Sequence, residues 1–262
     1  MRLISGFAIL PLLLAAVGAL DVAVDSTAAV TVDTTTTDSA SVAALSTSIL
    51  FRGGTVVAYN NVTQGLKVIR NGAVLVENDR ITGVYDLSAT TARIPFGCEV
   101  VDITGKIITP GFIDTHRHGW QTVFKTMGSN TTLIEFFGRY SSFVAPFFWN
   151  ASDIYDSQLA GLYEALNAGV TTSLDHATHT WSRDASNAGL QACIDSGARV
   201  FWGFTFANIS GVITVDQLYP VFREMAAKPA LKTSPTSIGI AYDGWGPNPN
   251  VAEINTIMAL AK

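Results

Sequence analysis

Residues 107–118 read IITPGFIDTHRH, a mostly apolar run that ends in two histidines separated by one residue. An apolar run of this length is typical of a buried strand in a parallel sheet. Because side chains alternate across a strand, His116 and His118 should point to one side and Arg117 to the other. Enzymes with parallel sheets place their sites at the carboxyl ends of the strands. Two imidazoles there predict a metal ion that activates water near neutral pH. The alternative is two histidines on a polar loop, and the apolar run before them argues against it.

Strand and helix patterns alternate after this run. Gly169 and Gly197 should end the first two helices, and Thr214 begins a capping box with Gln217. Four consecutive strand–helix units imply a parallel α/β sheet, either open or part of a barrel. No glycine fingerprint follows any of these strands, so a dinucleotide site gains no support. The expected strands are 107–114, 170–174, 200–206 and 238–242, and helices are expected from Ser152, around 190–194, from Thr214 and over 251–258.

Residues 49–106 have a different pattern, with short segments rich in β-branched residues. Asn71-Gly72 is a strong hairpin signal between two such segments, and Asn78-Asp79 indicates a second turn. We expect a small β-sandwich module here. Its predicted strands are 49–59, 67–70, 73–77 and 80–87.

The first 48 residues indicate export. Residues 1–19 have a basic start, a Leu-rich centre and a small-residue end, which is typical of a secretory signal peptide. A single-span anchor is the alternative, because the apolar run is of borderline length for crossing a bilayer. Residues 20–48 are rich in Ser and Thr and predict a linker. We therefore expect a secreted, glycosylated protein with no lasting membrane association. About two of the four N-glycosylation sequons would arise by chance, so the sequons support export only weakly.

Composition narrows the function classes. The chain has 262 residues, a net charge of −5 and 14% charged residues, which argues against a disordered chain. No cluster of Lys and Arg is present, so nucleic acid is not an expected partner. Cys98 and Cys193 cannot form a disulfide scaffold or a cysteine zinc cluster. The chain has no Gly-x-Ser-x-Gly elbow, so nucleophilic catalysis lacks support.

The chain resembles the amidohydrolase superfamily of metal-dependent hydrolases. Residues 107–118 are similar to its signature strand, and residues 50–57 and 101–106 are similar to its amino-terminal sandwich. The segments HGWQT (118–122) and LDHATH (174–179) most resemble the cytosine deaminase and chlorohydrolase-like branch. The resemblance implies a (β/α)8 TIM-type barrel beside a small β-sandwich. It also implies hydrolysis of a non-peptide carbon–nitrogen bond, as in a cyclic amidine or amide, by metal-activated water.

Matched residue by residue, the resemblance assigns only His116 and His118 as metal ligands. It implies one divalent ion, with zinc expected and iron as the alternative, because the expected fourth strand, 238–242, lacks the lysine that bridges two metals in other branches. The family takes further histidines from its fifth and sixth strands and an aspartate base from its eighth. None has a counterpart in this chain, so the catalytic base is unassigned.

A second histidine pair, His176 and His179, follows the second barrel-type strand and should open on the same rim. Three residues apart on an extended chain, the two cannot share a face, so we expect one of them to turn toward the rim. Contact with substrate, orientation of the metal ligands and plain packing all remain open, as does a four-histidine zinc site. Asp243 is either a substrate contact or a turn residue. The full set of expected substrate-binding residues is Trp120, Gln121, His176, His179 and Asp243.

Residues 119–152 form a long connection with nine aromatic side chains. Loops of this length are usually functional or disordered, and this composition is not that of a disordered one. The aromatic residues predict either an apolar wall over the site, which favours a small aromatic or heterocyclic substrate, or a short helix packed on the barrel. A patch for a membrane surface is a third alternative. The sequence leaves the oligomeric state open.

The length of residues 107–262 is sufficient for about half of a barrel that typically takes about 250 residues. We therefore expect a truncated product or a partial gene model of a hydrolase. A half barrel exposes strand edges, and a catalytic zinc generally needs three protein ligands, so we expect weak metal binding and either poor folding or association through the edges. The second hypothesis is a non-catalytic remnant or binding module. The transcript beyond Lys262 distinguishes the two.

Overall fold

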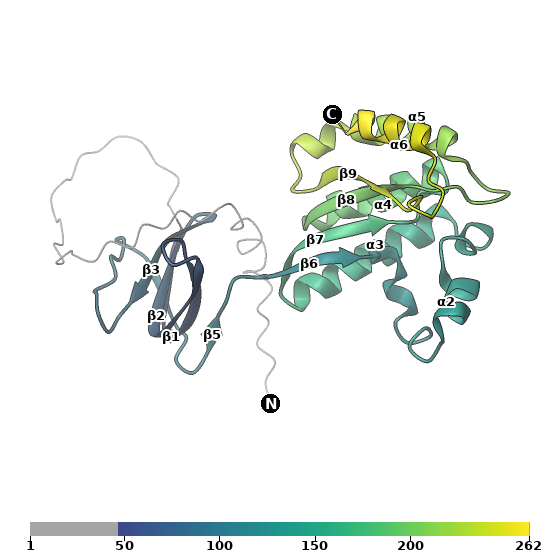
Figure 1. Ribbon diagram of the computed structural model, residues 1–262. Coiled ribbons are helices and arrows are strands. Elements are labelled where there is room, and N and C mark those ends of the chain that lie inside the picture. Colours follow the sequence, from purple (N-terminus) through teal and green to yellow (C-terminus); the bar gives the residue numbers. More distant parts are fainter. Residues whose placement is uncertain (1–46, 262) are drawn as a thin grey trace. The chain divides into compact units, whose positions relative to one another are not determined.

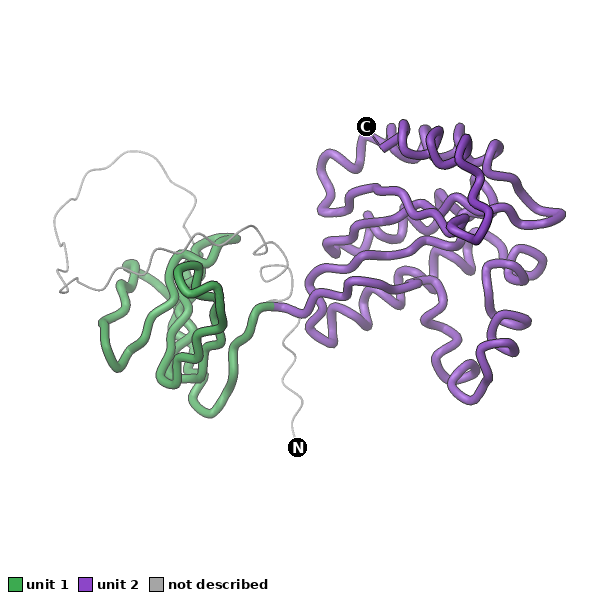
Figure 2. The backbone as a smooth tube through the Cα atoms, in the orientation of Figure 1, with its two compact units in different colours: residues 1–110 green, residues 111–262 purple. Residues whose placement is uncertain are grey.

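The computed structural model describes residues 47–261. The chain divides into two compact units at Pro110 and Gly111 (Figure 2). The predicted signal peptide and nearly all of the predicted linker lie outside the described residues, so both stay predictions. Among residues 47–261, no helix is both long enough and apolar enough to cross a membrane.

The first unit contains a five-stranded sheet with the order β3-β2-β1-β4, in which β5 also pairs with β1. The pairs β1–β2 and β2–β3 are antiparallel, whereas β4 and β5 run parallel to β1. Leu50 and Leu75 are at the centre of one buried cluster, and Val56 and Ile69 belong to another. The strands are β1 (Ser48–Asn60), β2 (Gly65–Glu77), β3 (Arg80–Asp86), β4 (Glu99–Asp102) and β5 (Ile107–Ile108).

The hairpin predicted at Asn71-Gly72 is wrong. Strand β2 continues through this dipeptide, and the chain reverses at residues 61–64 and at Asn78-Asp79 instead. A Cβ on Gly72 would lie 2.5 Å from Cγ2 of Val56, so the glycine allows a close approach between paired strands. The pairing of β1 with β2 shifts register on both sides of Gly54, the residue opposite Gly72. A glycine within a strand therefore marks an irregularity in the pairing here, and not a turn.

The second unit is built on a parallel sheet with the strand order β6-β7-β8-β9, each strand joined to the next by a helical connection (Figure 1). This confirms the four predicted strand–helix units. Asn150, and not Ser152, caps the first long helix, with Asp153 completing the capping box. The strands are β6 (Phe112–Arg117), β7 (Val170–Ala177), β8 (Arg199–Phe206) and β9 (Ser237–Tyr242), and the helices are α3 (Ala151–Asn167), α4 (Arg183–Ser196), α5 (Val215–Ala226) and α6 (Val251–Leu260).

The predicted first barrel strand, 107–114, is interrupted. Ile107 and Ile108 pair with β1 in the first unit, and β6 begins only at Phe112. Pro110 lies between the two segments and has no backbone N–H to donate to a strand ladder. Phe112 and Ile113 are 64% and 62% exposed, so this strand is not the buried one that its apolar sequence predicts.

The two faces of the parallel sheet differ. On β8, Val200, Trp202 and Phe204 are buried, while the intervening Phe201 is 43% exposed. The buried side faces α4 and α5, and α3 packs on β7. The opposite face, which we call the inner face, carries Phe201 and its neighbour in register, Leu174. The inner face is the one on which the candidate site lies.

Candidate metal centre

Three histidines meet at the carboxyl ends of β6 and β7. His116 lies near the end of β6, His118 directly follows that strand, and His176 lies near the end of β7. One ring nitrogen from each lies within 4.8 Å of the other two, and the ring centroids are 5.0–5.4 Å apart. The alternation of β6 places His116 and His118 on one side, while Arg117 donates to the carbonyl of Gly161 in α3 on the other. The structure therefore brings together the predicted metal ligands and one member of the second histidine pair.

A backbone contact fixes the ring of His118. Its Nδ1 lies 2.8 Å from the carbonyl oxygen of His176. A carbonyl only accepts hydrogen bonds, so Nδ1 must carry the proton and Nε2 is left with its lone pair. Burial lowers the pKa of His118, which favours the neutral ring. Neutral imidazole is the form that binds a metal ion.

Asp243 lies beside the third histidine. Its Oδ1 is 3.2 Å from Nε2 of His176, and the side chain of His176 is largely buried while that of Asp243 is half exposed. The hydrogen bond with His176 lowers the pKa of Asp243, so the carboxylate is favoured. Asp243 comes directly after β9, as the sequence predicted for a residue at the rim.

A buried carboxylate, that of Asp175, links β7 to the residue that follows His118, and the sequence analysis did not identify it. Asp175 is fully buried, and its Oδ1 accepts the backbone N–H of Gly119, at 2.9 Å. Its Oδ2 accepts a hydrogen bond from Nε2 of Gln158 in α3, at 2.5 Å. Burial raises the pKa of Asp175. Because Gly119 follows His118 and Asp175 precedes His176, this contact holds β6 and β7 together at their histidines. The available signal was an aspartate directly after the predicted strand 170–174 and directly before His176.

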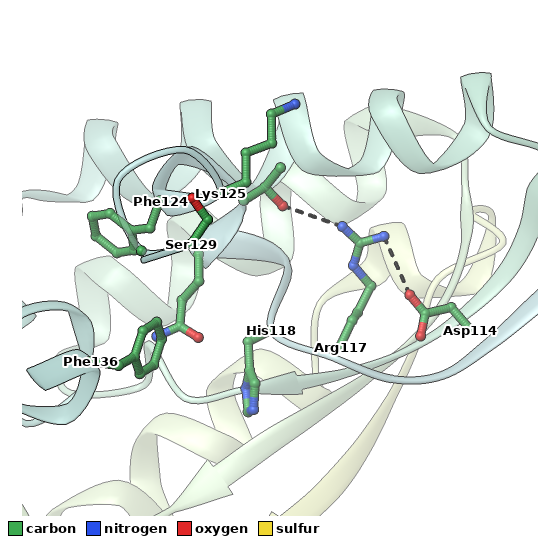
Figure 3. A pocket seen from close by; sticks show the side chains of 10 residues that line it. Asp114, Arg117, His118, Phe124, Lys125, Ser129 and Phe136 are labelled. Carbon is green, nitrogen blue, oxygen red and sulfur yellow. Dashed lines mark hydrogen bonds and ion pairs between the residues drawn. The ribbon is translucent and has the colours of Figure 1, made fainter. Parts of the chain in front are cut away.

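A hollow of about 510 Å³ lies beside His118, lined in part by Gln121, Lys125 and Phe136. Arg117 reaches toward Asp114 at its edge, at 3.7 Å, and His118 points to a different side of the strand (Figure 3). A second hollow of about 260 Å³ lies on the inner face next to His176 and is lined mainly by apolar side chains and glycines of β7, β8 and β9. The histidine cluster thus has open space on two sides.

The other residues expected to bind substrate lie elsewhere. Trp120 and His179 are both fully buried, with ring centroids 6.5 Å apart, and His179 also packs on Trp202. A solute cannot reach either side chain in this structure. Gln121 is partly buried and donates to the carbonyl of Tyr140. The chain turns after Ala177, so only His176 of the second pair faces the site, as the spacing of the pair predicted.

The aromatic connection divides into two parts. Trp120, Phe124 and Trp149 pack against one another in the core, whereas Phe147 and Phe148 are 62% and 79% exposed. The helix α2 (Leu133–Tyr140) has no buried residue. Short 3-10 turns, η1 (Gly119–Phe124) and η2 (Ala145–Phe147), complete the segment. Part of the connection therefore packs as predicted, while the side chains of Phe147 and Phe148 stay exposed.

The position of His179 depends on a glycine. A Cβ on Gly189 of α4 would collide with Nε2 of the buried His179 ring. We predict that Gly189→Ala lowers the free energy of unfolding by roughly 1–3 kcal/mol, because a packed core tolerates no added atom there. Urea denaturation measures the change. Gly138→Ala is the matched control, since a Cβ there meets nothing within 4 Å in α2 and should be neutral or stabilising. Equal stability of the two variants would contradict the packing described.

His179 also predicts acid sensitivity. Burial lowers its pKa to about 3, from 6.5, and neither ring nitrogen has a hydrogen-bond partner. The unfolded chain binds this proton more readily, so stability is full above pH 6.5 and falls as the pH drops from 6.5 toward 3. The slope from this group is at most about 1.4 kcal/mol per pH unit. We predict that His179→Leu flattens this part of the stability profile measured by urea denaturation. An unchanged slope would show that other groups cause the loss.

The three imidazoles fit a divalent metal ion. Imidazole suits zinc and iron, and the cluster places three donor atoms within 4.8 Å of one another on two adjacent strands. The hydrogen bond at His118 Nδ1 leaves the second nitrogen of that ring free to bind. Such a contact from the far side of a ligating ring is the usual partner of a metal-bound histidine.

A family model described as the amidohydrolase family matches residues 107–241, just over half of the chain. The chain belongs to the amidohydrolase family. The match begins at Ile107, the first residue of β5, and ends within β9.

Curated relatives of this amidohydrolase are deaminases. It is 33% identical over 127 residues to a 5-methylthioadenosine/S-adenosylhomocysteine deaminase of Symbiobacterium thermophilum, a match that covers 48% of this chain and 28% of the relative. It is 31% identical over 133 residues to a 5'-deoxyadenosine deaminase of Methanothermobacter thermautotrophicus, covering 49% and 30%. The amidohydrolase thus matches about a third of the length of these relatives.

Solved structures agree on the fold. A guanine deaminase from C. acetobutylicum with bound guanine has a TM-score of 0.65 at 16% identity, covering 81% of this chain and 50% of that one. An adenosine deaminase from Xanthomonas campestris with bound zinc has a TM-score of 0.59 at 18% identity, covering 81% and 46%. These likenesses show a partial barrel of the amidohydrolase type. The expectation of a truncated product stays a prediction.

Proposed function

We propose that this amidohydrolase is a secreted, metal-dependent hydrolase that removes an amino group from a small nitrogen heterocycle. The observation that carries the proposal is the meeting of His116, His118 and His176 at the carboxyl ends of two parallel strands. Family membership and the deaminase relatives support the reaction class. Zinc is the proposed ion, supported by the zinc-bound structural neighbour.

The residues of this chain would act as follows. His116 and His118 hold the ion, and the carbonyl of His176 keeps the ring of His118 in a fixed orientation. A divalent ion bound there supplies a Lewis acid that activates water near neutral pH. The inner-face hollow of about 260 Å³, with Leu174, Phe201 and Ile240 in its wall, offers apolar side chains against which a heterocycle can pack. No described residue is assigned as the base.

Ammonia release tests the reaction. The full chain, loaded with one equivalent of zinc, is incubated separately with adenosine, 5'-deoxyadenosine, 5-methylthioadenosine, guanine and cytosine. We expect ammonia from at least one of them, loss of activity with a chelator, recovery with zinc, and no activity in His116→Ala. A chain that binds zinc but releases no ammonia from any of these compounds would contradict the proposal and favour the binding-module hypothesis.

Export of the protein is a separate part of the proposal and rests on residues 1–19. Amino-terminal sequencing of protein recovered from the medium should begin close after Ala19. Recovery only from cells, with Met1 or Arg2 still present, would contradict export.

A further inference from the structure

We infer that His176 is the third metal ligand of this chain and that Asp243 is the positioning residue that orients it. The resemblance to the family leads one to expect the third histidine on the fifth barrel strand, whereas His176 lies on the second. The inference rests on the metal site of the proposed function and extends it to two residues that the family signature does not assign.

The first argument is the geometry of the three rings. Donor atoms of His116, His118 and His176 lie within 4.8 Å of one another, a spacing that a small shift on binding can close around one ion. The ring centroid of His176 is 5.4 Å from that of His116 and 5.0 Å from that of His118. His176 is thus a neighbour of both other rings and stands as close to each as they stand to one another.

The second argument is the linkage between the two strands. The backbone carbonyl of His176 accepts the hydrogen bond from Nδ1 of His118, at 2.8 Å. The preceding residue, Asp175, accepts the N–H of Gly119, at 2.9 Å. The position of His176 is therefore fixed relative to His118 by two contacts, one from its own carbonyl and one from the side chain of the preceding residue. A preformed arrangement of this kind lowers the cost of bringing a third ligand to the ion.

The third argument is the contact between His176 and Asp243 across β8. The residue of β8 in register with His176 is Gly203, which itself pairs with Gly239 of β9. Asp243 directly follows β9, and its Oδ1 lies 3.2 Å from Nε2 of His176, so the contact spans the intervening strand β8. A carboxylate placed against the ring of a ligating histidine fixes the orientation of the ring and raises its basicity.

Cobalt titration tests both roles. Apo full-length chain is titrated with Co²⁺, and absorption reports both affinity and coordination, because four-coordinate cobalt absorbs visible light far more strongly than six-coordinate cobalt. With three histidines and a water molecule we expect a four-coordinate spectrum. His176→Ala should weaken Co²⁺ binding by more than about 100-fold and give the weak six-coordinate spectrum. Asp243→Asn should weaken binding by about 10–100-fold but keep the four-coordinate spectrum.

The controls separate the possible failures. Asp184→Asn replaces an exposed aspartate in the first turn of α4 and should leave Co²⁺ affinity unchanged. Circular dichroism of each variant confirms that the fold is kept. A wild-type chain that binds no Co²⁺ would overturn the proposed metal site together with this inference. If His116→Ala abolishes binding while His176→Ala keeps the wild-type affinity and spectrum, the inference alone is wrong. An Asp243→Asn spectrum like that of His176→Ala would make Asp243 a ligand and overturn its positioning role.

Discussion

Replacing His116 or His118 with alanine should abolish stoichiometric metal binding and all metal-dependent hydrolysis. The two imidazoles come from one strand, and loss of either leaves at most two histidine donors in the cluster. Because a catalytic zinc generally needs three protein ligands, we expect zinc affinity to fall by at least 100-fold (on the order of 3 kcal/mol). Zinc content after dialysis, measured by mass spectrometry, should drop from about one equivalent to near zero.

His179→Leu is the matched control for this prediction. It removes a histidine from the same part of the chain, but one that is buried against Trp120 and Trp202 and whose ring nitrogens have no hydrogen-bond partner. The control should keep its zinc. Retention of stoichiometric zinc by His116→Ala, or loss of zinc from the control in a folded state, would contradict the assignment of the ligands.

Replacing Asp175 with alanine should have the largest effect on stability. The substitution leaves the N–H of Gly119 buried without an acceptor, and it leaves the amide of Gln158 with only Sγ of Cys193, a weak acceptor. Each unsatisfied donor costs about 1–3 kcal/mol, so we expect a loss of about 2–6 kcal/mol in the free energy of unfolding. Zinc affinity should fall as well, because the contact with Gly119 helps to position the adjacent His118.

Asp175→Asn tests the contribution of the hydrogen bonds, because asparagine keeps the volume of the side chain and removes only the carboxylate. The asparagine keeps an acceptor for Gly119, and Gln158 can turn its own amide to accept from the new NH2 group. We expect the asparagine variant to lose less than half of what the alanine variant loses in urea denaturation. Equal losses in both variants would show that the carboxylate, and not the hydrogen bonds, stabilises this region.

The sequence predicted the elements that depend on local patterns. Thr214 and Gln217 form the expected capping box, and Gly169 and Gly197 adopt the left-handed conformation at the ends of α3 and α4. Alternation along β6 correctly placed His116 and His118 on one face. These features depend only on residues that are close together in the chain, and their physical causes are visible in the sequence.

Features that depend on register between strands could not be predicted. Asn71-Gly72 has the sequence of a turn, but its pairing with β1 keeps it in a strand. The proximity of His176 to His116 and His118 depends on the register between β6 and β7, which no local sequence pattern determines. Contact between His176 and Asp243 further depends on the register of β8 and β9, because the two residues come from strands that are not neighbours.

X-ray absorption at the zinc edge of the zinc-loaded full chain tests the central claim most directly. It counts imidazole ligands by their multiple scattering and measures the Zn–N distance. We predict one zinc ion with three imidazoles at about 2.0–2.1 Å. A zinc ion without imidazole scattering, or a folded chain that holds no zinc, would contradict the histidine metal centre described.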